Sequence, residues 1–387
     1  MTSLDTFAKE KLKPLADQGL QRHLQLTERT SGGKAQRDGR QMISFCCNDY
    51  LNFTHHPKVR QAAKDAIDRY GAGSGASRLI TGNHPLIAEL ENRLARLKGT
   101  EDACVFSSGY LANIGIIPTL IGQQDIIFID ELSHACLRAG SSLTGAQIVT
   151  FPHNDMDQLQ SQINLLRPRH QNALIVTDGV FSMDGDLAPL DQLSRLARDN
   201  DCWLMTDDAH GVGVIGHGEG MGKGSRHMFD PLPDIPLQMG TLSKAIGSFG
   251  GYLCASKPVI DLIKTRARSL IYTTALPPAS VAAALAALDI IETEPEYCSR
   301  PLKNARLFAR LVSLPEPASP IVPVIIGDTE KTMKFAKLLE DDGFLVTGIR
   351  PPTVAFGTAR LRFTFSAEHQ EEDIRALTTS LKKHGIV

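Results

Sequence analysis

From about residue 85 onward, the spacing of apolar positions alternates between two patterns. Residues 86, 87, 90, 94 and 97 are apolar, and this spacing predicts a helix over residues 86–98. Short apolar runs separated by helical lengths predict five buried strands, at residues 103–106, 126–129, 147–151, 173–177 and 203–206. Strands that alternate with helices in this way predict a mostly parallel sheet with helices on both faces.

The two ends of the chain show other patterns. The first thirty residues have leucines at 12, 15, 20, 24 and 26, which predicts a helix broken at Pro14 and Gly19, and the polar residues 31–40 predict a hairpin or a linker. A smaller α+β unit is predicted from about residue 285, with strands at 321–326 and 361–365 and helices at 330–341 and 370–383. We therefore expect an N-terminal helix and arm (1–50), a large domain (51–284) and a small C-terminal domain (285–387).

Composition narrows the class of protein. The 387 residues are 42% hydrophobic and 22% charged, which is typical of a globular protein. The net charge of −2 gives no reason to expect nucleic acid or an anionic membrane as partner. No apolar run reaches the roughly 18 residues of a membrane-spanning helix, and residues 279–291 predict a packed helix instead. The N-terminus lacks the basic and apolar regions of a signal peptide, so we expect a cytoplasmic protein.

The cysteines support neither a disulfide framework nor a metal site. There are seven of them, an odd number, and no CxxC or CxxH spacing occurs. Most lie in apolar segments, which predicts that they behave as small core residues in a reducing compartment.

The strongest candidate chemistry lies between residues 203 and 251. Asp207 and His210 directly follow the predicted strand 203–206, and ligands of open α/β sheets bind at this carboxyl edge. Lys244 lies among small and apolar residues, a setting that lowers the pKa of an amine. A carboxylate that keeps a pyridinium nitrogen protonated and a lysine that forms a Schiff base are what pyridoxal 5′-phosphate (PLP) chemistry needs. These residues predict a PLP site in the large domain.

Other residues extend this predicted site. Ser108, Gly109 and Tyr110 follow a strand and open an apolar helix, whose N-terminal N–H groups can bind the phosphate; alternatively, Ser108 is a helix N-cap and nothing more. His134, after the strand 126–129, is placed to stack on the pyridine ring, and His210 to approach its phenolic oxygen, although each can also be a structural histidine. Thr241 can add a phosphate hydrogen bond.

Two glycine patterns resemble nucleotide-binding motifs, but neither has the sequence context that its motif requires. Residues 211–216 match GxGxxG, but the glycine-rich residues that follow cannot propagate the helix that a dinucleotide site requires. Gly222 and Lys223 resemble part of a P-loop, but His217 and Gly224 break that motif. We interpret residues 211–224 as a flexible loop beside the active site, and a nicotinamide oxidoreductase as the weakest alternative.

A carboxylate clamp is predicted in the C-terminal unit. Arg350 and Thr353 enclose two prolines, and a guanidinium held by such a segment can bind a carboxylate through two parallel hydrogen bonds. The alternative interpretation is a surface turn.

Taken together, these motifs resemble the α-oxoamine synthases, a family of fold-type I PLP-dependent enzymes. The resemblance runs from about residue 20 to the C-terminus and rests on SGYLAN at 108–113, GVFSMDGD at 179–186, DDAHG at 207–211 and TLSK at 241–244. It implies a large domain with a mostly parallel sheet and a smaller C-terminal α+β domain. It also implies that the protein condenses an amino acid with an acyl thioester and releases CO2.

The resemblance implies a role for each matching residue. Lys244 would form the Schiff base, Asp207 would bind the pyridine nitrogen, and His134 would stack on the ring. The remaining cofactor contacts would come from Ser108, Gly109, Tyr110, Ser182, His210 and Thr241. Thr274 would reach the phosphate of a neighbouring subunit, because the family forms homodimers with shared active sites.

The same comparison implies substrate contacts from Arg22, Asn48, Arg350 and Thr353. Residues 349–354 and 357–362 most resemble family members that join L-alanine to a pimeloyl thioester, carried on CoA or on an acyl carrier protein, in biotin biosynthesis. Two residues depart from the family pattern: Ala355 stands in place of a proline, and Asn52 in place of a glycine near the active-site entrance. A sibling reaction, such as glycine with acetyl-CoA, and a catalytically silent PLP-fold binding protein remain alternatives.

Overall fold

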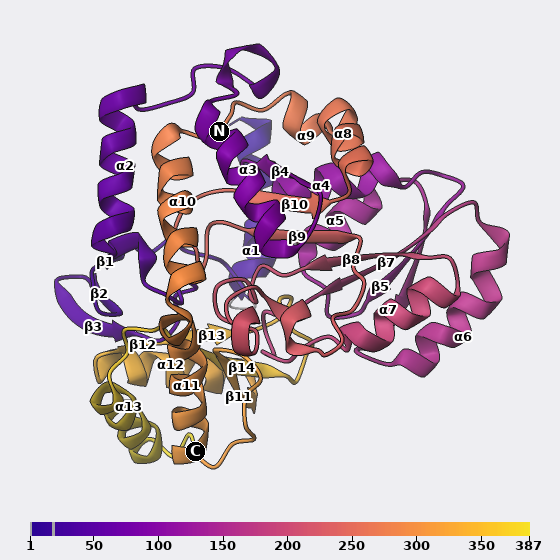
Figure 1. The fold of residues 1–387 in the computed structure, drawn as a ribbon. Helices are drawn as coiled ribbons and strands as arrows, with labels where there is room; N and C mark the ends of the chain where they lie inside the picture. The colour runs from indigo at the N-terminus through magenta and orange to yellow at the C-terminus, as the bar shows by residue number, and fades with distance from the viewer. Residues whose placement is uncertain (1, 18–19) are drawn as a thin grey trace.

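The central layer of the molecule is a twisted sheet (Figure 1). The computed structural model describes residues 2–17 and 20–387, and within these ranges the largest sheet has seven strands. Their order is β4 (Asp102–Phe106), β10 (Gly251–Ala255), β9 (Leu237–Thr241), β8 (Trp203–Asp207), β7 (Ala173–Asp178), β5 (Ile126–Asp130) and β6 (Gln147–Phe151). Strand β10 is antiparallel to both of its neighbours, and all the other pairings are parallel. The predicted mostly parallel sheet is therefore confirmed, and β9 and β10, which the sequence analysis missed, border Lys244.

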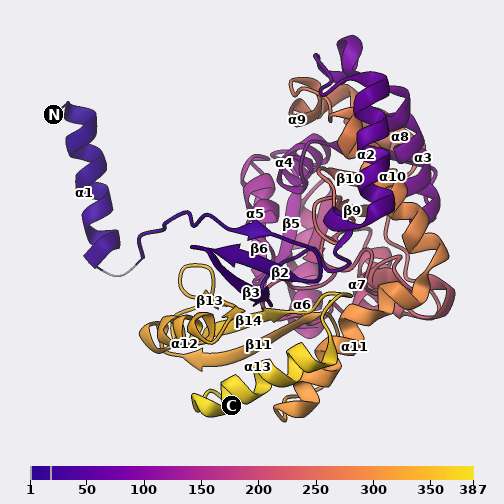
Figure 2. The same ribbon diagram turned by 90° about the vertical axis from the view of Figure 1, so that its left-hand side faces the viewer.

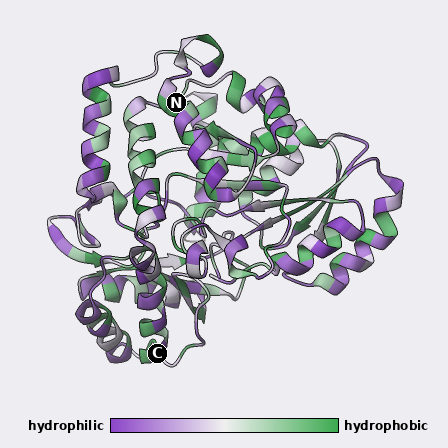
Figure 3. Ribbon diagram, viewed as in Figure 1, coloured by the Kyte–Doolittle hydropathy of each residue, from purple (hydrophilic) through white to green (hydrophobic). Residues whose placement is uncertain are grey.

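Alternating side chains of these strands enter separate cores. Met205 and Leu253 pack with α4 (Gly109–Leu120), α5 (Ala135–Ser142) and α8 (Lys257–Arg266). Their neighbours Leu204 and Tyr252 point to the opposite face, because successive strand side chains alternate. That face is covered by α6 (Met156–Leu166), α7 (Leu190–Asp199), α3 (Pro85–Lys98) and α10 (Pro278–Thr293). In Figure 3 the central strands are mostly hydrophobic, whereas α2 (Pro57–Tyr70), which lies outside α10 and buries only Val59 and Ala66, is mostly hydrophilic.

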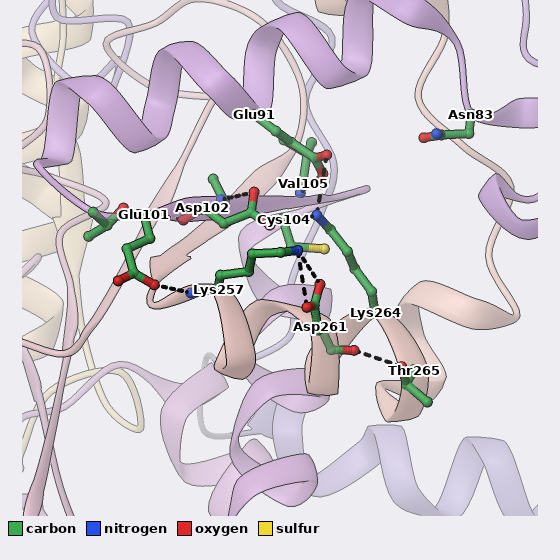
Figure 4. A network of polar contacts seen from close by, with 12 residues as sticks. Asn83, Glu91, Glu101, Asp102, Cys104, Val105, Lys257, Asp261, Lys264 and Thr265 are labelled. Carbon is green, nitrogen blue, oxygen red and sulfur yellow. Dashed lines mark hydrogen bonds and ion pairs between the residues drawn. The ribbon is translucent and has the colours of Figure 1, made fainter.

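Helix α8 is fixed to the edge strand β4 by a surface network of charges (Figure 4). Lys264 Nζ lies 3.1 Å from Asp102, and the backbone N–H of Lys257 donates to Glu101 over 2.8 Å. Beside them, Glu91 on α3 accepts a 2.8 Å hydrogen bond from the backbone of Val105. Half-exposed ion pairs contribute little stability, so the apolar contacts beneath them hold this edge.

The C-terminal unit is a small antiparallel sheet with helices. Strand β14 (Ala359–Thr364) lies between β11 (Ile321–Gly327) and β13 (Thr347–Ile349). Its helices are α11 (Pro295–Leu311), α12 (Thr329–Asp341) and α13 (Glu371–Lys383), so both predicted strands and both predicted helices of this unit are confirmed. The predicted hairpin is also present, with β2 (Lys34–Arg37) antiparallel to β3 (Arg40–Ser44). The hairpin joins β1 (Glu28–Arg29) and β12 (Phe344–Leu345) in a second small sheet.

The predicted N-terminal helix is wrong in its extent. Helix α1 covers Ser3–Asp17, with Pro14 inside it, and residues 20–27 are neither helix nor strand. Gly19, the second predicted break, lies outside the described residues. Leu24 and Leu26 are more than 90% exposed, so their side chains lack the tertiary packing that stabilises a helix in a protein. Figure 2 shows α1 standing apart from the body of the molecule, and α9 (Arg268–Ile271) at the top of it.

Boundaries between the units are crossed by secondary structure. Helix α10 continues through position 285, and its Leu288 and Ile291 lie in the same core as Val212 and Ile246. In addition, β3 pairs with β12, so the arm and the C-terminal unit share a sheet. The division at residues 50 and 284 stays a proposal.

The glycine-rich loop is more buried than we expected. Residues 211–214 form turns, and Val212, Val214 and Ile215 belong to the hydrophobic core. Only two short 3₁₀ segments, Gly218–Gly220 and Ser225–Met228, follow. Because no helix opens here, neither a dinucleotide fingerprint nor a P-loop is formed.

Two sequence-level observations have direct structural counterparts. Asn52 adopts the left-handed conformation, with φ 53°, which glycine and asparagine tolerate better than other residues; this explains how asparagine can stand in place of the family's glycine. Of the seven cysteines, all of which are free thiols, five are buried. No helix in the described part of the chain is both long and apolar enough to cross a membrane.

Candidate active site

Eight of the predicted cofactor residues line one cavity at the carboxyl edge of the sheet. The cavity has a volume of about 220 Å³. Its lining contains Ser108, Gly109, Tyr110, His134, Asp207, His210, Thr241 and Lys244, together with Cys136, Asp178, Ala209, Met239 and Ser243. Strands β7 and β8 end in register here, with Asp178 opposite Asp207. The parallel sheet thus brings together residues that are far apart in the sequence.

Lys244 lies in the loop between β9 and β10, with its amine directed at His210. The distance from Lys244 Nζ to His210 Nε2 is 2.7 Å. Burial lowers the pKa of Lys244 to about 8, although the negative charges of Asp207 and Asp178 oppose the shift. The uncharged form, which alone is nucleophilic or basic, is therefore far more populated near neutral pH than in a lysine with the usual pKa of 10.5.

His210 is buried and hydrogen-bonded on both ring nitrogens. Its Nδ1 lies 2.7 Å from the hydroxyl of Tyr50. Burial holds the pKa of His210 well below its usual value, and the positive charges of Lys244 and Arg362 act in the same direction. The imidazole is therefore neutral and carries a single N–H.

Asp207 is held by donors on both carboxylate oxygens. Its Oδ2 accepts a 2.8 Å hydrogen bond from the side-chain amide of Asn113 on α4, and its Oδ1 accepts one of 3.0 Å from the backbone of Ala209. Asp178, beside it on β7, is also buried, and burial together with the charge of Asp207 raises the pKa of Asp178 well above its usual value. Asp207 therefore lies beside a second buried carboxyl group, with both of its own oxygens held by hydrogen-bond donors.

His134 and Ser108 both cap helices at the cavity. The ring of His134 accepts from the backbone N–H of Cys136 over 3.2 Å at the start of α5, and burial lowers its pKa. The hydroxyl of Ser108 accepts from Leu111 over 3.1 Å at the start of α4. The N-cap interpretation of Ser108 is thus confirmed, and it leaves the first N–H groups of α4 without intrahelical acceptors at the cavity wall.

Thr241 ends β9 beside the N-terminus of α4. Its hydroxyl donates to the carbonyl of Gly250 over 2.8 Å and lies 2.8 Å from the Ser243 hydroxyl. A side chain at position 109 would meet Met239 and Thr241 at 3.2 and 3.6 Å, so the end of the Met239 side chain would have to shift slightly. Glycine thus fits the close approach of α4 to the sheet without such a shift.

The other predicted residues do not line this cavity. Arg22, Thr353 and Thr274 are exposed, and the carbonyl of Thr274 accepts from Ser107 over 3.3 Å. Arg350 is half-buried, with one weak contact of 3.5 Å to the carbonyl of Gln21, next to Arg22. The predicted carboxylate clamp therefore lies close to the predicted acyl-binding residue Arg22. Within the described residues, most guanidinium donors of Arg350 and Arg22 make no hydrogen bond, in contrast to the side chains that line the cavity.

Asn48 and Ser182 meet through Arg362. The Oδ1 of Asn48 accepts from the Arg362 guanidinium at 3.3 and 3.4 Å, and the carbonyl of Ser182 accepts from Arg362 Nε at 2.5 Å. These contacts connect β14 of the small domain to the N-terminal arm through Asn48 and to the large domain through Ser182. The predicted strand 361–365 carried this arginine, but nothing in the sequence indicated which way it would point.

Four further residues of the site were missed. Asp178 follows the strand 173–177 as Asp207 follows 203–206, and this parallel could have identified it. Asn113 lies one helical turn beyond Gly109, so it shares a face with the start of α4. Cys136 and Tyr50 gave no local signal of a role in the site. Within residues 2–17 and 20–387 no group of three or more histidines, cysteines and acids could hold a metal ion.

Asp208, the neighbour of Asp207, has a separate and structural role. It forms a fully buried ion pair with Lys98, whose Nζ lies 3.0 Å from Asp208 Oδ2 and also donates to the carbonyl of Lys223 over 2.8 Å. Asp208 in turn accepts from the backbone of Ser225. The pair anchors the glycine-rich loop behind the cavity.

Known sequences show the family of this chain. A profile of the class I and II aminotransferase family matches residues 40–381. The chain is 57% identical, over 100% of its length and 98% of the relative's, to a putative 8-amino-7-oxononanoate synthase of Parvibaculum lavamentivorans. It is 59% identical, over 97% of the chain and 96% of the relative, to an 8-amino-7-oxononanoate synthase of Beijerinckia indica. The subgroup that residues 349–354 and 357–362 predicted is thereby confirmed.

Solved structures show the same fold. A serine palmitoyltransferase from S. paucimobilis with bound PLP is 30% identical, with a TM-score of 0.91 and complete coverage of both chains. An 8-amino-7-oxononanoate synthase from Francisella tularensis is 27% identical, with a TM-score of 0.75 over 89% of this chain and 99% of that one. The fold-type I prediction is therefore confirmed.

Proposed function

The chain belongs to the class I and II aminotransferase family, among the PLP-dependent acyltransferases called 8-amino-7-oxononanoate synthases, and from this premise we propose its reaction. We propose that it condenses L-alanine with a pimeloyl thioester to give 8-amino-7-oxononanoate, CO2 and a free thiol, in biotin biosynthesis. The observation that carries this proposal is the identity of 57% over the whole chain to a relative with that name. The thiol carrier is CoA or an acyl carrier protein, and the enzyme works in the cytoplasm.

The residues of the cavity fit PLP. Asp207 supplies a fixed buried carboxylate for the pyridine nitrogen, and Lys244 an amine with a lowered pKa for the aldehyde. The N-terminus of α4, with Ser108, Gly109 and Tyr110, would bind the phosphate together with Thr241. His134 would lie against the ring, and His210 and Ser182 near its phenolic oxygen. When bound, PLP supplies an electron sink for the substrate Cα.

Lys244 would then move the proton at that carbon. Burial lowers the pKa of its amine to about 8, so a larger share of this amine is uncharged near neutral pH than of an ordinary lysine. It can therefore take the Cα proton as a general base. Attack of that carbon on the thioester carbonyl would form the new C–C bond and break the C–S bond, with the thiolate as leaving group. Loss of the substrate carboxylate as CO2 would follow, and Lys244 would return its proton to the same carbon.

Substrate contacts would come from outside the cavity. We assign Arg350, Thr353 and Asn48 to substrate binding, and Arg22 to binding of the acyl substrate. Asn48 is held in place by the guanidinium of Arg362. The proximity of Arg350 to Gln21 supports a joint site for both substrates. In a homodimer with shared sites, Thr274 would contact the phosphate bound by the neighbouring copy.

Thiol release tests the reaction. PLP-loaded protein is given L-alanine with pimeloyl-CoA, and in parallel glycine with acetyl-CoA. Release with the alanine pair alone would support the proposal. Release with glycine alone would retain the chemistry of Lys244 but overturn the substrate assignment.

A sibling reaction has one specific observation in its favour. The TM-score of 0.91 to a serine palmitoyltransferase motivates a third arm with L-serine and palmitoyl-CoA. Release in this arm alone would replace the proposed substrates.

A further inference from the structure

Behind the cavity, three side chains form a continuous hydrogen-bonded chain. Tyr50 OH lies 2.7 Å from His210 Nδ1, and His210 Nε2 lies 2.7 Å from Lys244 Nζ. His210 and Lys244 line the cavity, but Tyr50 does not, and its side chain is completely buried. Tyr50 therefore acts on the cavity only through His210.

The surroundings of Tyr50 fix where its proton goes. Burial raises the pKa of Tyr50 to about 12, so the phenol keeps its proton at any working pH. The positive charge of Arg362 opposes this shift, and a guanidinium only donates, so Arg362 cannot accept the proton of Tyr50. That proton then has two possible acceptors: His210 Nδ1 at 2.7 Å and Asn48 Oδ1 at 3.4 Å. The shorter contact is the effective one, and Asn48 Oδ1 already accepts from Arg362.

We propose that Tyr50 is a positioning residue that holds His210 with Nδ1 as acceptor and Nε2 as the protonated nitrogen facing the cavity. The assignment applies whenever Lys244 carries no positive charge, either as a free amine or with its nitrogen covalently bound. A neutral imidazole has one N–H, so a donor at Nδ1 places the proton on Nε2. His210 then presents a donor to whatever lies in the cavity. The catalytic value of this donor rests on the proposed function, but the proton position does not.

The orienting group here is a phenol instead of the more usual carboxylate. A carboxylate behind a histidine accepts from Nδ1 and stabilises the doubly protonated ring, whereas a phenol with a raised pKa donates and stays neutral. That choice fits the surroundings of His210, where Lys244, Arg362 and burial already lower its pKa. Tyr50 thus orients His210 without adding charge to the buried site.

Nitrogen NMR of the histidine ring tests the proton position directly. Full-length protein freed of cofactor is labelled with ¹⁵N-histidine in a Lys244→Met background, which removes the amine at every pH. The signals of His210 among the 12 histidines are assigned by their loss in Lys244→Met/His210→Gln. We expect His210 to carry its proton on Nε2 near neutral pH, and to lose that preference when Tyr50→Phe is added. A proton on Nδ1 in the Tyr50-containing protein, or an unchanged tautomer after Tyr50→Phe, would overturn the proposal.

Kinetics and absorbance test the consequence in the PLP-loaded enzyme with Lys244 intact. Losing one hydrogen bond to His210 should lower kcat about three- to tenfold in Tyr50→Phe, with little change in KM for L-alanine. The pH midpoint of the visible absorbance should rise, since a less well-oriented donor stabilises a phenolic anion less. A normal kcat together with a normal absorbance midpoint would contradict the role.

The matched control is Tyr252→Phe. Tyr252 is also fully buried, but its hydroxyl has no hydrogen-bond partner among the residues that the structure describes. Equal losses in the two variants would show a general effect of removing a buried hydroxyl and would overturn the proposal. If thiol release fails with every substrate pair, the NMR result still decides the tautomer, so failure of the proposed function can be distinguished from failure of this inference.

Discussion

Two regions of the molecule contribute predicted functional residues in contrasting ways. We define the strand-end cluster as Asp207, His210 and Lys244. Asp207 is held by Asn113 and the backbone of Ala209, and His210 is held between Tyr50 and Lys244. The substrate loop, residues 350–358, is held by few contacts: Arg350 has one at 3.5 Å, and Phe356 is 88% exposed. The groups that perform chemistry are thus preorganised, which lowers the cost of reorganisation during reaction. The groups proposed to select substrate keep their donors free until a substrate arrives.

The largest expected effect comes from the amine of the cluster. Lys244→Ala should abolish both thiol release and the visible absorbance of the PLP-loaded protein, because no other residue of the cavity supplies an amine. Absorbance spectra and the thiol assay measure the two properties separately. If the variant retains both thiol release and the visible absorbance, Lys244 is not the reactive residue and the strand-end cluster does not perform the proposed chemistry.

Asp207→Asn tests the charge of the cluster while keeping its shape. The variant should still bind PLP but lose about 100- to 1000-fold in kcat, similar to the loss of one preorganised electrostatic contact in other enzymes. Cofactor binding is measured by equilibrium dialysis and the rate by thiol release. A near-normal rate would rule out Asp207 as the partner of the pyridine nitrogen.

Asp208→Asn is the matched control for the neighbouring position. It breaks the buried pair with Lys98, so we expect a loss of about 3 kcal/mol in the free energy of unfolding. Urea unfolding measures this loss. Molecules that remain folded should retain most of their activity, and a selective loss of kcat without a loss of stability would show that Asp208 belongs to the chemistry.

Arg350→Ala addresses the substrate loop. If its guanidinium binds a substrate carboxylate, KM for L-alanine should rise by about tenfold or more, the value of a hydrogen bond to a charged group. The kcat should change little, since the cluster is untouched. Steady-state kinetics separate the two parameters, and Arg22→Ala, which should affect KM for the acyl substrate instead, is the comparison. An unchanged alanine KM would remove Arg350 from the proposed clamp.

The smallest effect concerns the pH dependence of the cluster. The pKa of Lys244 is lowered from its usual 10.5 to about 8, so the uncharged fraction of this amine rises as pH increases through 8. Incorporation of PLP into cofactor-free protein should therefore become faster with pH, with a midpoint near 8, and level off above it. Stopped-flow absorbance over a pH series measures the rate. A rate that keeps rising toward pH 10.5 would show that burial does not lower this pKa.

Local sequence patterns were sufficient to predict most of the layers and the position of the cluster. The strand 203–206 is short and apolar, so Asp207 had to follow at its carboxyl end, where parallel sheets bind ligands. Strands β9 and β10 were missed because LQMGT and GYLCA contain glycine and polar residues, whose burial depends on neighbours across the sheet. The helix over the first thirty residues was predicted too long because leucine spacing alone does not supply a packing partner.

The sequence by itself determined the chemical groups, their order and the type of sheet that carries them. Only the tertiary structure showed that the adjacent Asp208 pairs with Lys98 behind the cavity. It also placed Tyr50 behind His210, although the two are 160 residues apart. Hydrogen bonds and burial act between neighbours in space, and for residues far apart in the chain these neighbours depend on how the strands and helices pack.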